Sequence, residues 1–263
     1  MELEHFDFYG LKISTFQMQD LDRFISDTFS RKDGAICYGY SLGILPWFRK
    51  YPNLYNITNK SELILTDGRW LYNLLKLKRC PICKNLSIPE FVFYTLDFAN
   101  KLELNVFLFG ACEENNRNAC LEINSKYPNI KVFGQSGYYN NIEEKEIIKR
   151  IADLDIDLVL VGLPTPQKEE LSLKYKKQFK TSMIIPCGGM IDVLSGKITP
   201  SPSWLKNFGL ASFFRVLQEP RRLFYKKFKE FLLIFFYILP LILVNVLLKN
   251  KQFSIPKILG IKN

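Results

Sequence analysis

The stretch from residue 157 to residue 169, DLVLVGLPTPQKE, holds the pattern on which the fold depends. Its residues 158–161 are apolar without interruption, as is typical of a strand that is buried on both faces of a sheet. Gly162 and two prolines then break the run, and residues 167–179 have the polar spacing of a helix. The stretch therefore predicts a buried strand, a tight glycine turn and a helix.

The same pattern recurs along the whole chain. Further strand-like runs lie at residues 36–40, 63–65, 106–109, 130–133 and 183–186, and helical candidates lie near residues 18–30, 69–78, 88–101, 113–126 and 142–152. Apolar strands that alternate with helices indicate a mostly parallel sheet with helices on both faces. We therefore predict an α/β, Rossmann-like fold for the main part of the chain.

Charge is distributed unevenly over the 263 residues. The net charge is +10, and residues 197–263 contain 12 Lys and Arg against 2 Asp and Glu, so this tail carries the whole excess. A neutral body with a basic tail suits attachment to an anionic surface, either membrane phospholipid or nucleic acid. We predict an α/β body over residues 1–200 and a helical, membrane-associating appendage over residues 201–263.

The apolar run at residues 231–248 favours the membrane over nucleic acid. It contains no charged residue, and lysines flank it on both sides. A helix of this length reaches roughly 27 Å, which only just spans a hydrocarbon core. Pro240 and Asn245 weaken the case for a span, so a spanning, a re-entrant and an in-plane helix all remain open. A helix buried against the body is a further alternative.

The first ten residues, MELEHFDFYG, lack the basic and apolar segments of a signal peptide. We therefore expect the body at the cytoplasmic face of the membrane, with its six cysteines reduced. The one CxxC motif, at residues 80–83, lacks two further zinc ligands, and no metal site is predicted. Residues 153–157, DLDID, resemble a metal-binding DxD motif, but they precede their strand and should form a solvated loop at the opposite edge of the sheet.

Glycines and acids follow five of the predicted strands. In open α/β sheets, ligands bind beyond the carboxyl ends of the strands, where glycine turns and helix N-termini offer free amides. The segments at that edge are 67–68, 110–112, 134–138, 162–167 and 188–192. Together they predict a phosphate-bearing or polar ligand there. The chain has no Walker A loop and no G-x-G-x-x-G fingerprint, so the sequence does not support a simple ATPase or NAD-dependent dehydrogenase.

Asp67, in LILTDGRW at residues 63–70, has two interpretations. Aspartate is a preferred N-cap, so it could begin the following helix. A carboxylate at the ligand-binding edge could also accept a proton as a general base. One residue can serve both purposes, and the sequence leaves both open.

Several segments in one order resemble the WecG/TagA/CpsF family of bacterial glycosyltransferases. They are TDG at 66–68, NVFLFG at 105–110, KYPNIKVFGQSGYY at 126–139, DLVLVGLPTPQKE at 157–169, CGGMIDVLSGKI at 187–198 and GLASFFRVLQEPRRL at 209–223. The resemblance implies transfer of N-acetylmannosamine, a uronic acid or a related hexose in cell-surface polysaccharide synthesis. It implies a UDP-sugar donor, a polyprenyl-diphosphate-linked acceptor, inversion at the sugar, and no metal or other cofactor. A homo-oligomer remains open.

The resemblance also implies roles for individual residues. Asp67 takes the place of the proposed catalytic base, and the arginines of the appendage, Arg215, Arg221 and Arg222, would offset the charge of the diphosphate. Alternatively these arginines form a basic face toward anionic lipid. Asp192 could accept a hydrogen bond from the uridine, or cap a helix. The remaining predicted substrate-binding residues are Gly68, Gly110, Gly137, Tyr138, Gly162, Gln167, Gly188 and Gly189.

Some positions depart from the pattern of the family. Gln167 stands one place earlier than the glutamine of the usual PxQE, Pro200 replaces an expected arginine, and Ala211 stands in place of the acid of GLEW. These departures hint at a changed sugar or acceptor. They also support an alternative function, a catalytically inactive, membrane-bound subunit that binds nucleotide sugars or acts as a scaffold in polysaccharide assembly.

Overall fold

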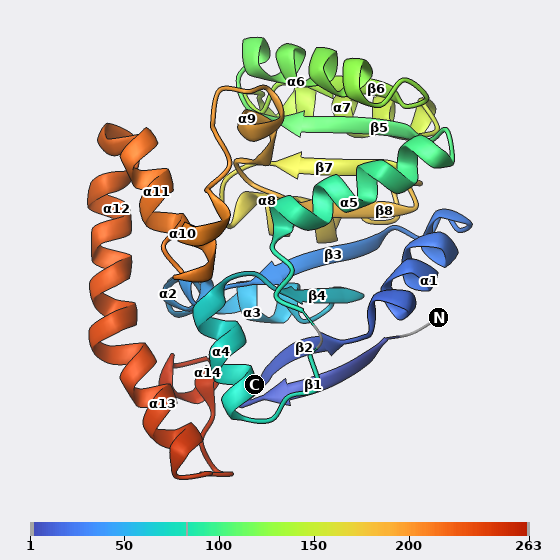
Figure 1. Cartoon of the computed structure of the whole chain (residues 1–263). Helices are drawn as coiled ribbons and strands as arrows, with labels where there is room; N and C mark the ends of the chain where they lie inside the picture. Colours follow the sequence, from blue (N-terminus) through green and yellow to red (C-terminus); the bar gives the residue numbers. More distant parts are fainter. Residues whose placement is uncertain (1–2, 83, 262–263) are drawn as a thin grey trace.

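A computed structural model describes residues 3–82 and 84–261, without the side chains of residues 203, 222, 223, 226 and 227 (Figure 1). Its centre is a six-stranded sheet in which all neighbouring strands run parallel. The strand order is β4 (Leu63–Thr66), β3 (Ala35–Tyr40), β8 (Met183–Pro186), β7 (Leu158–Gly162), β5 (Asn105–Gly110) and β6 (Lys131–Gln135). All six predicted strands are present, and the α/β prediction is confirmed.

Helices cover both faces of this sheet. One face packs against α1 (Met18–Phe29), α5 (Ile88–Lys101), α6 (Glu113–Lys126) and α9 (Met190–Leu194). The other face packs against α7 (Asn141–Asp153) and α8 (Gln167–Lys174) on the β5–β7 side. The strands contribute alternate residues to the two cores, as the pleat requires. Helix α8 ends five residues earlier than the sequence predicts.

A third apolar cluster joins the two ends of the chain. It contains the antiparallel hairpin of β1 (Glu4–Phe8) and β2 (Leu11–Thr15), which the sequence analysis did not predict. The helices between β3 and β4 were also missed, namely η1 (Leu42–Ile44), α2 (Leu45–Lys50) and α3 (Pro52–Thr58). Helix α4 (Arg69–Leu77), which follows Asp67, packs in the same cluster.

The C-terminal segment is helical and lies along the body (Figure 1). Two short helices, α10 (Ser203–Asn207) and α11 (Ala211–Gln218), lead into α12 (Pro220–Leu233). The π-helical turn η2 (Ile234–Ile238) joins α12 to α13 (Leu239–Leu247), and α14 (Ile255–Ile258) follows after a turn. Part of this segment belongs to the third cluster. The division into a body of residues 1–200 and an appendage of residues 201–263 stays a prediction.

The DLDID segment lies where the sequence placed it, at the edge of the sheet where β7 begins. Lys32 pairs there with Asp155 at 3.2 Å and with Asp157 at 2.6 Å, and Asp157 also accepts the backbone N–H of Asn105. These contacts tie the loops before β3, β5 and β7 together. The carboxyl ends of the strands, and the candidate site, lie at the other edge.

Candidate functional site

The parallel sheet brings the predicted glycines to one edge. Gly110 at the end of β5 stands beside Gly162 at the end of β7, and the N–H of Gly137 donates to the carbonyl oxygen of Ala111 at 2.8 Å. A Cβ on Gly110, whose φ is +149°, would lie 2.5 Å from the carbonyl oxygen of Gly162. Only glycine fits there without displacing backbone. This edge therefore offers bare backbone at the ends of β5, β6 and β7.

Asp67 occupies the end of β4 at the same edge. Its backbone N–H donates to the carbonyl oxygen of Tyr40 on β3 at 2.7 Å. The N-cap of α4 is Gly68, with φ +126° and no side-chain cap, so of the two interpretations of Asp67 the structure does not support the helix cap. The carboxylate instead accepts the backbone N–H of Ile88, in the first turn of α5. The side chain is thus held between β4 and α5, with part of its surface accessible.

The surroundings of Asp67 suit a base that works near neutral pH. Burial raises the pKa of its carboxyl to about 6, although the N–H of Ile88 acts in the opposite direction. The negative charge of Glu90 raises this pKa further, and the positive charges of Lys168 and Lys206 lower it. Desolvation therefore outweighs the amides of the helix end. A carboxyl with a pKa near 6 is ionised at neutral pH and still basic enough to accept a proton.

Lys168, which the sequence analysis did not select, is a buried cation at this edge. Its ammonium group pairs with Glu169 and lies 4.8 Å from the centre of the Tyr38 ring. The hydroxyls of Tyr38 and Thr165 donate to the same Glu169 oxygen, Oε1, at 2.8 and 3.1 Å. The Cε of Lys168 would lie 3.7 Å from a Cβ on Gly188, at the end of β8. Lys168 is therefore a cation that the body itself supplies at the turn after β8.

The predicted substrate-binding residues Gln167 and Tyr138 are exposed, unlike Lys168. The exposed amide of Gln167 donates to the hydroxyl of Tyr139 at 3.0 Å, and the side chain of Tyr138 is 81% exposed. Because Gln167 and Lys168 are the first two residues of α8, the start of the helix decides which of them faces the sheet. The spacing of the motif alone does not tell which of the two side chains is buried.

Asp192 and Arg215 connect the body to the appendage. Asp192 accepts a hydrogen bond from the amide of Asn115 at 2.7 Å and lies 3.8 Å from Arg215, which also pairs with Glu219 at 3.2 Å. The N-cap of α9 is Gly189, so the structure does not support the alternative in which Asp192 caps a helix. The Arg215 guanidinium would lie 2.8 Å from a Cβ on Gly189. Helix α11 thus carries its arginine to the turn after β8.

The other two arginines lie on α12. Arg221 is exposed, and the side chain of Arg222 lies outside the described residues. Of the two predicted arginines whose side chains are described, Arg215 is therefore the one that the structure brings to the strand ends. Lys168 and Arg215 approach the same turn, Gly188–Gly189, from the body and from the appendage.

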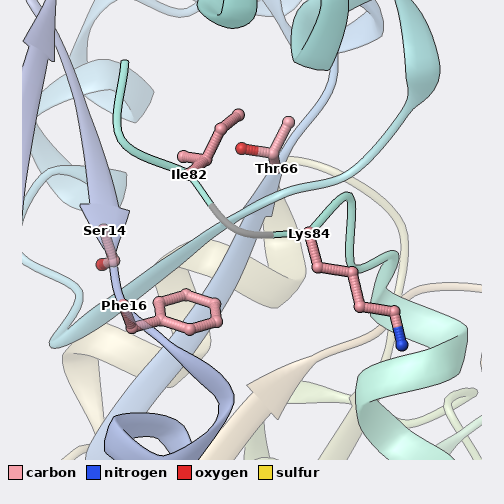
Figure 2. Close-up of a pocket in the computed structure, with 5 residues that line it drawn as sticks. All are labelled: Ser14, Phe16, Thr66, Ile82 and Lys84. Carbon is pink, nitrogen blue, oxygen red and sulfur yellow. The ribbon is translucent and has the colours of Figure 1, made fainter.

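Figure 2 shows a shallow hollow next to β4, with no room for a whole water molecule, lined by Ser14, Phe16, Thr66, Ile82 and Lys84. The Lys84 side chain points away from the other four. Pockets for small molecules usually have volumes of about 300 to 1,000 Å³. This hollow is too small for a sugar nucleotide, so the open edge beyond the strands remains the candidate site.

The cysteines and acids of the described residues, 3–82 and 84–261, form no group of three that could hold a metal ion. Cys80 of the CxxC motif is buried, and burial raises the pKa of its thiol to about 11. Cys83, the other cysteine of that motif, lies outside the described residues.

Comparison with known proteins assigns the family. Residues 6–247 match the model of the glycosyl transferase family WecG/TagA/CpsF. This chain belongs to the WecG/TagA/CpsF family. The match includes Asp67, Lys168, Asp192 and Arg215 and extends to the end of α13, whereas α14 lies beyond it.

Three relatives of this chain carry the name N-acetylglucosaminyldiphosphoundecaprenol N-acetyl-beta-D-mannosaminyltransferase. The protein of Bacillus subtilis (strain 168) is 30% identical over 169 residues, which are 64% of this chain and 65% of that protein. The Bacillus spizizenii protein is 27% identical over 65% of this chain and 66% of its own length. The Staphylococcus aureus (strain MW2) protein is 25% identical, over 64% and 65%. The chain thus spans slightly less than two thirds of the length of these relatives.

Proposed function

We propose that this WecG/TagA/CpsF protein transfers a hexose-type sugar, such as N-acetylmannosamine or a uronic acid, from a UDP-sugar to a polyprenyl-diphosphate-linked acceptor. The main support is the position of Asp67, a partly accessible carboxylate with a pKa of about 6 at the carboxyl edge of the sheet. The relatives' name describes an acceptor of this kind, N-acetylglucosaminyl-diphosphoundecaprenol. The reaction would serve cell-surface polysaccharide synthesis.

The proposed chemistry is a single displacement. Asp67 accepts the proton of an acceptor hydroxyl while that oxygen attacks the anomeric carbon of the donor. The bond between that carbon and the diphosphate oxygen breaks, and its electron pair leaves with UDP. Attack from the face opposite the leaving group inverts the configuration of the sugar. The proton remains on Asp67 until solvent removes it.

The leaving diphosphate gains negative charge, which cations can stabilise. Lys168 and Arg215 flank the Gly188–Gly189 turn, and we place the diphosphate there without a metal. The neighbouring glycines at the ends of β5, β6 and β7 would accept the rest of the nucleotide. Arg215 pairs with Asp192 and Glu219, so binding the diphosphate would exchange these carboxylates for phosphate oxygens.

The proposed acceptor is a membrane lipid, which requires the site to lie at a membrane. We therefore propose that residues 1–200 bind the UDP-sugar, and that the basic segment 201–263 holds the body at the anionic cytoplasmic face of the membrane. The excess of 10 positive charges in residues 197–263 supports this division of roles. Nucleic acid is not a proposed partner, and the proposal is independent of oligomeric state.

The test is release of UDP from a panel of UDP-sugars by the full-length protein, with and without polyprenyl-diphosphate-GlcNAc, in the presence of EDTA. Acceptor-dependent release is expected, and Asp67→Asn should abolish it while UDP still binds. Asp33→Asn, at an acid that is 54% exposed at the other edge of the sheet, is the matched control. UDP binding without turnover on any acceptor would favour the inactive-subunit alternative.

A further inference from the structure

The apolar segment Phe228–Leu247 meets the length and composition of a membrane span. It is a helical stretch of 20 residues, and its most apolar 18 residues have a mean hydropathy of 2.4 and are 22% buried. Such a helix would reach about 30 Å, close to the thickness of a hydrocarbon core. Its contacts with the rest of the molecule decide between a span and an in-plane helix.

One side of this segment is part of the protein core. Ile234, Ile238, Ile242 and Val246 are each at most 7% exposed and belong to the cluster that contains the β1–β2 hairpin and α4. Their spacing of four residues puts them on one face of the helix. At the start of the stretch, Trp47 of α2 donates to Glu230 at 3.1 Å. The helix therefore lies against the body over its length.

The chain contacts the body again after the segment ends. The N–H of Ile255 donates to the carbonyl oxygen of Tyr9 at 2.9 Å, and the Phe253 ring packs edge-on against the Tyr9 ring at 5.0 Å. The Tyr9 hydroxyl also donates to the carbonyl oxygen of Asn245, near the end of α13. Residues 253–261 are thus seated on the β1–β2 hairpin.

The chain before the segment is held by the same body. Lys206 of α10 pairs with Glu90 of α5 at 3.3 Å, and Arg215 of α11 reaches Asp192. A helix that crossed a bilayer would separate the parts before and after it by about 30 Å of hydrocarbon. Both parts contact one folded body, so they lie on one side of any membrane.

The outer side of the appendage is apolar and exposed. Of 22 large apolar side chains that are exposed among the described residues, 16 lie between residues 204 and 248. Many are aromatic, including Trp204, Phe208, Phe228 and Phe236, and lysines flank the stretch on both sides. Aromatic side chains beside basic residues suit the boundary between lipid headgroups and acyl chains.

We infer that α12, η2 and α13 lie in the plane of an anionic membrane surface, with the Phe236 side in the lipid, and that α14 stays on the same side as the body. The helix is then an in-plane anchor and not a span. This arrangement explains why basic residues flank both ends, because both ends remain at one headgroup layer. The inference rests on packing and charge and does not depend on the proposed transfer reaction.

The arrangement also places the candidate site relative to the lipid. Trp70, in the first turn of α4 after Asp67, packs edge-on against Phe235 at 5.2 Å, and its indole fits against Gly209. The first turn of α4 therefore contacts η2, which is part of the segment that faces the membrane. If the proposed function holds, a lipid-linked acceptor approaches Asp67 from that side.

Labelling with a membrane-impermeant maleimide tests the side on which α14 lies. Lys257→Cys, exposed on α14, and Lys126→Cys, 64% exposed on the body, are compared in right-side-out and inverted membrane vesicles. The native cysteines of the parent chain give the background. We expect both positions to react in the same vesicle orientation. Reaction in opposite orientations would establish a span and overturn the inference.

Flotation with vesicles of phosphatidylglycerol and phosphatidylcholine tests the outer face. We expect the full-length protein to float with these vesicles and to bind neutral vesicles less. Phe236→Glu, at a side chain 76% exposed, should lower the bound fraction at least tenfold. Leu121→Glu, 61% exposed on α6, is the matched control and should bind normally. The inference would be overturned if the protein did not bind vesicles and instead formed a dimer that Phe236→Glu dissociates. That result would show that a second copy of the chain covers this face.

Discussion

At the scale of single residues, the surroundings of Asp67 predict how the rate depends on pH. Burial raises the pKa of this carboxyl from its ordinary value of 3.8 to about 6. A base must be ionised, so kcat/KM for the proposed transfer should fall about tenfold per pH unit below pH 6. Initial rates between pH 4.5 and 8 measure this limb. A profile that stays flat down to pH 4.5 would remove Asp67 from the role of base.

The same shift has a consequence for stability. The folded chain binds the Asp67 proton more tightly than the unfolded chain, so this contribution is present below pH 3.8 and is lost as the pH rises through 6. Asp67→Asn carries no charge at any pH. We therefore expect its melting temperature to equal or exceed that of the parent at pH 8, which separates a chemical defect from a folding defect.

Lys168 supplies a second prediction at this scale. Lys168→Gln removes a buried cation next to Asp67 and leaves Glu169 with its two hydroxyl donors. Because the charge of Lys168 lowers the pKa of Asp67, the acid limb of the rate profile should move to higher pH. UDP affinity should also fall, by about tenfold for one lost charge-assisted contact.

Lys174→Gln makes the same change at the other end of α8, at a side chain that is 61% exposed and pairs with Glu144. It should leave the acid limb and UDP affinity unchanged. Isothermal titration with UDP and rate profiles measure both quantities. An unaltered Lys168→Gln profile with normal UDP affinity would reduce Lys168 to a packing role.

The sequence predicted Asp67 but not Lys168, for a physical reason. Asp67 follows directly from the end of a strand, and that position alone puts it at the ligand-binding edge. Lys168 and Gln167 differ by about 100° around the start of α8, so only the exact first residue of the helix tells which is buried. Helix boundaries are the part of a sequence prediction that local composition determines least.

At the scale of elements, five strands of the parallel sheet were predictable because they are almost entirely buried and read as apolar runs, whereas the edge strand β6 is only partly buried. The β1–β2 hairpin was missed, since His5 and Asp7 alternate with apolar residues over only a few positions. Its turn has positive φ at Tyr9 and Gly10, and a tyrosine there gives no turn signal. Pro46 and Pro52 hid α2 and α3, although both prolines stand in the first turn of a helix.

The apolar C-terminal helix gives a prediction about its packing. Ile238→Ala removes a fully buried side chain from the shared core and should destabilise the folded chain by about 2–5 kcal/mol. Phe236→Ala, two residues earlier on the exposed side, should change stability by less than about 0.5 kcal/mol. Urea unfolding without lipid measures both. Equal and small effects would mean that the helix does not fold as part of the body.

At the scale of the whole molecule, the sequence showed that the basic charge and the apolar run share one tail, but not how that tail packs. In a run that is apolar on every side, composition does not distinguish the stripe facing the protein from the stripe facing lipid. That distinction comes from the shape of the β1–β2 hairpin and α4, which accept Ile234, Ile238, Ile242 and Val246. The tail is thus part of the core, and in our proposal it also attaches the protein to the membrane.

This double role predicts that substitutions on the outer face affect transfer only when the acceptor is in a membrane. Phe236→Glu leaves Asp67, Lys168 and Arg215 in place, so transfer to a short-chain, water-soluble acceptor should proceed at the parent rate. With a long-chain acceptor in anionic vesicles, the weaker attachment should raise the apparent KM about tenfold, and added salt should raise it further. UDP release under both conditions measures the difference. Equal losses on the two acceptors would mean that Phe236 supports the catalytic edge itself, whereas a loss confined to vesicles would mean that the exposed aromatic face delivers the enzyme to its substrate.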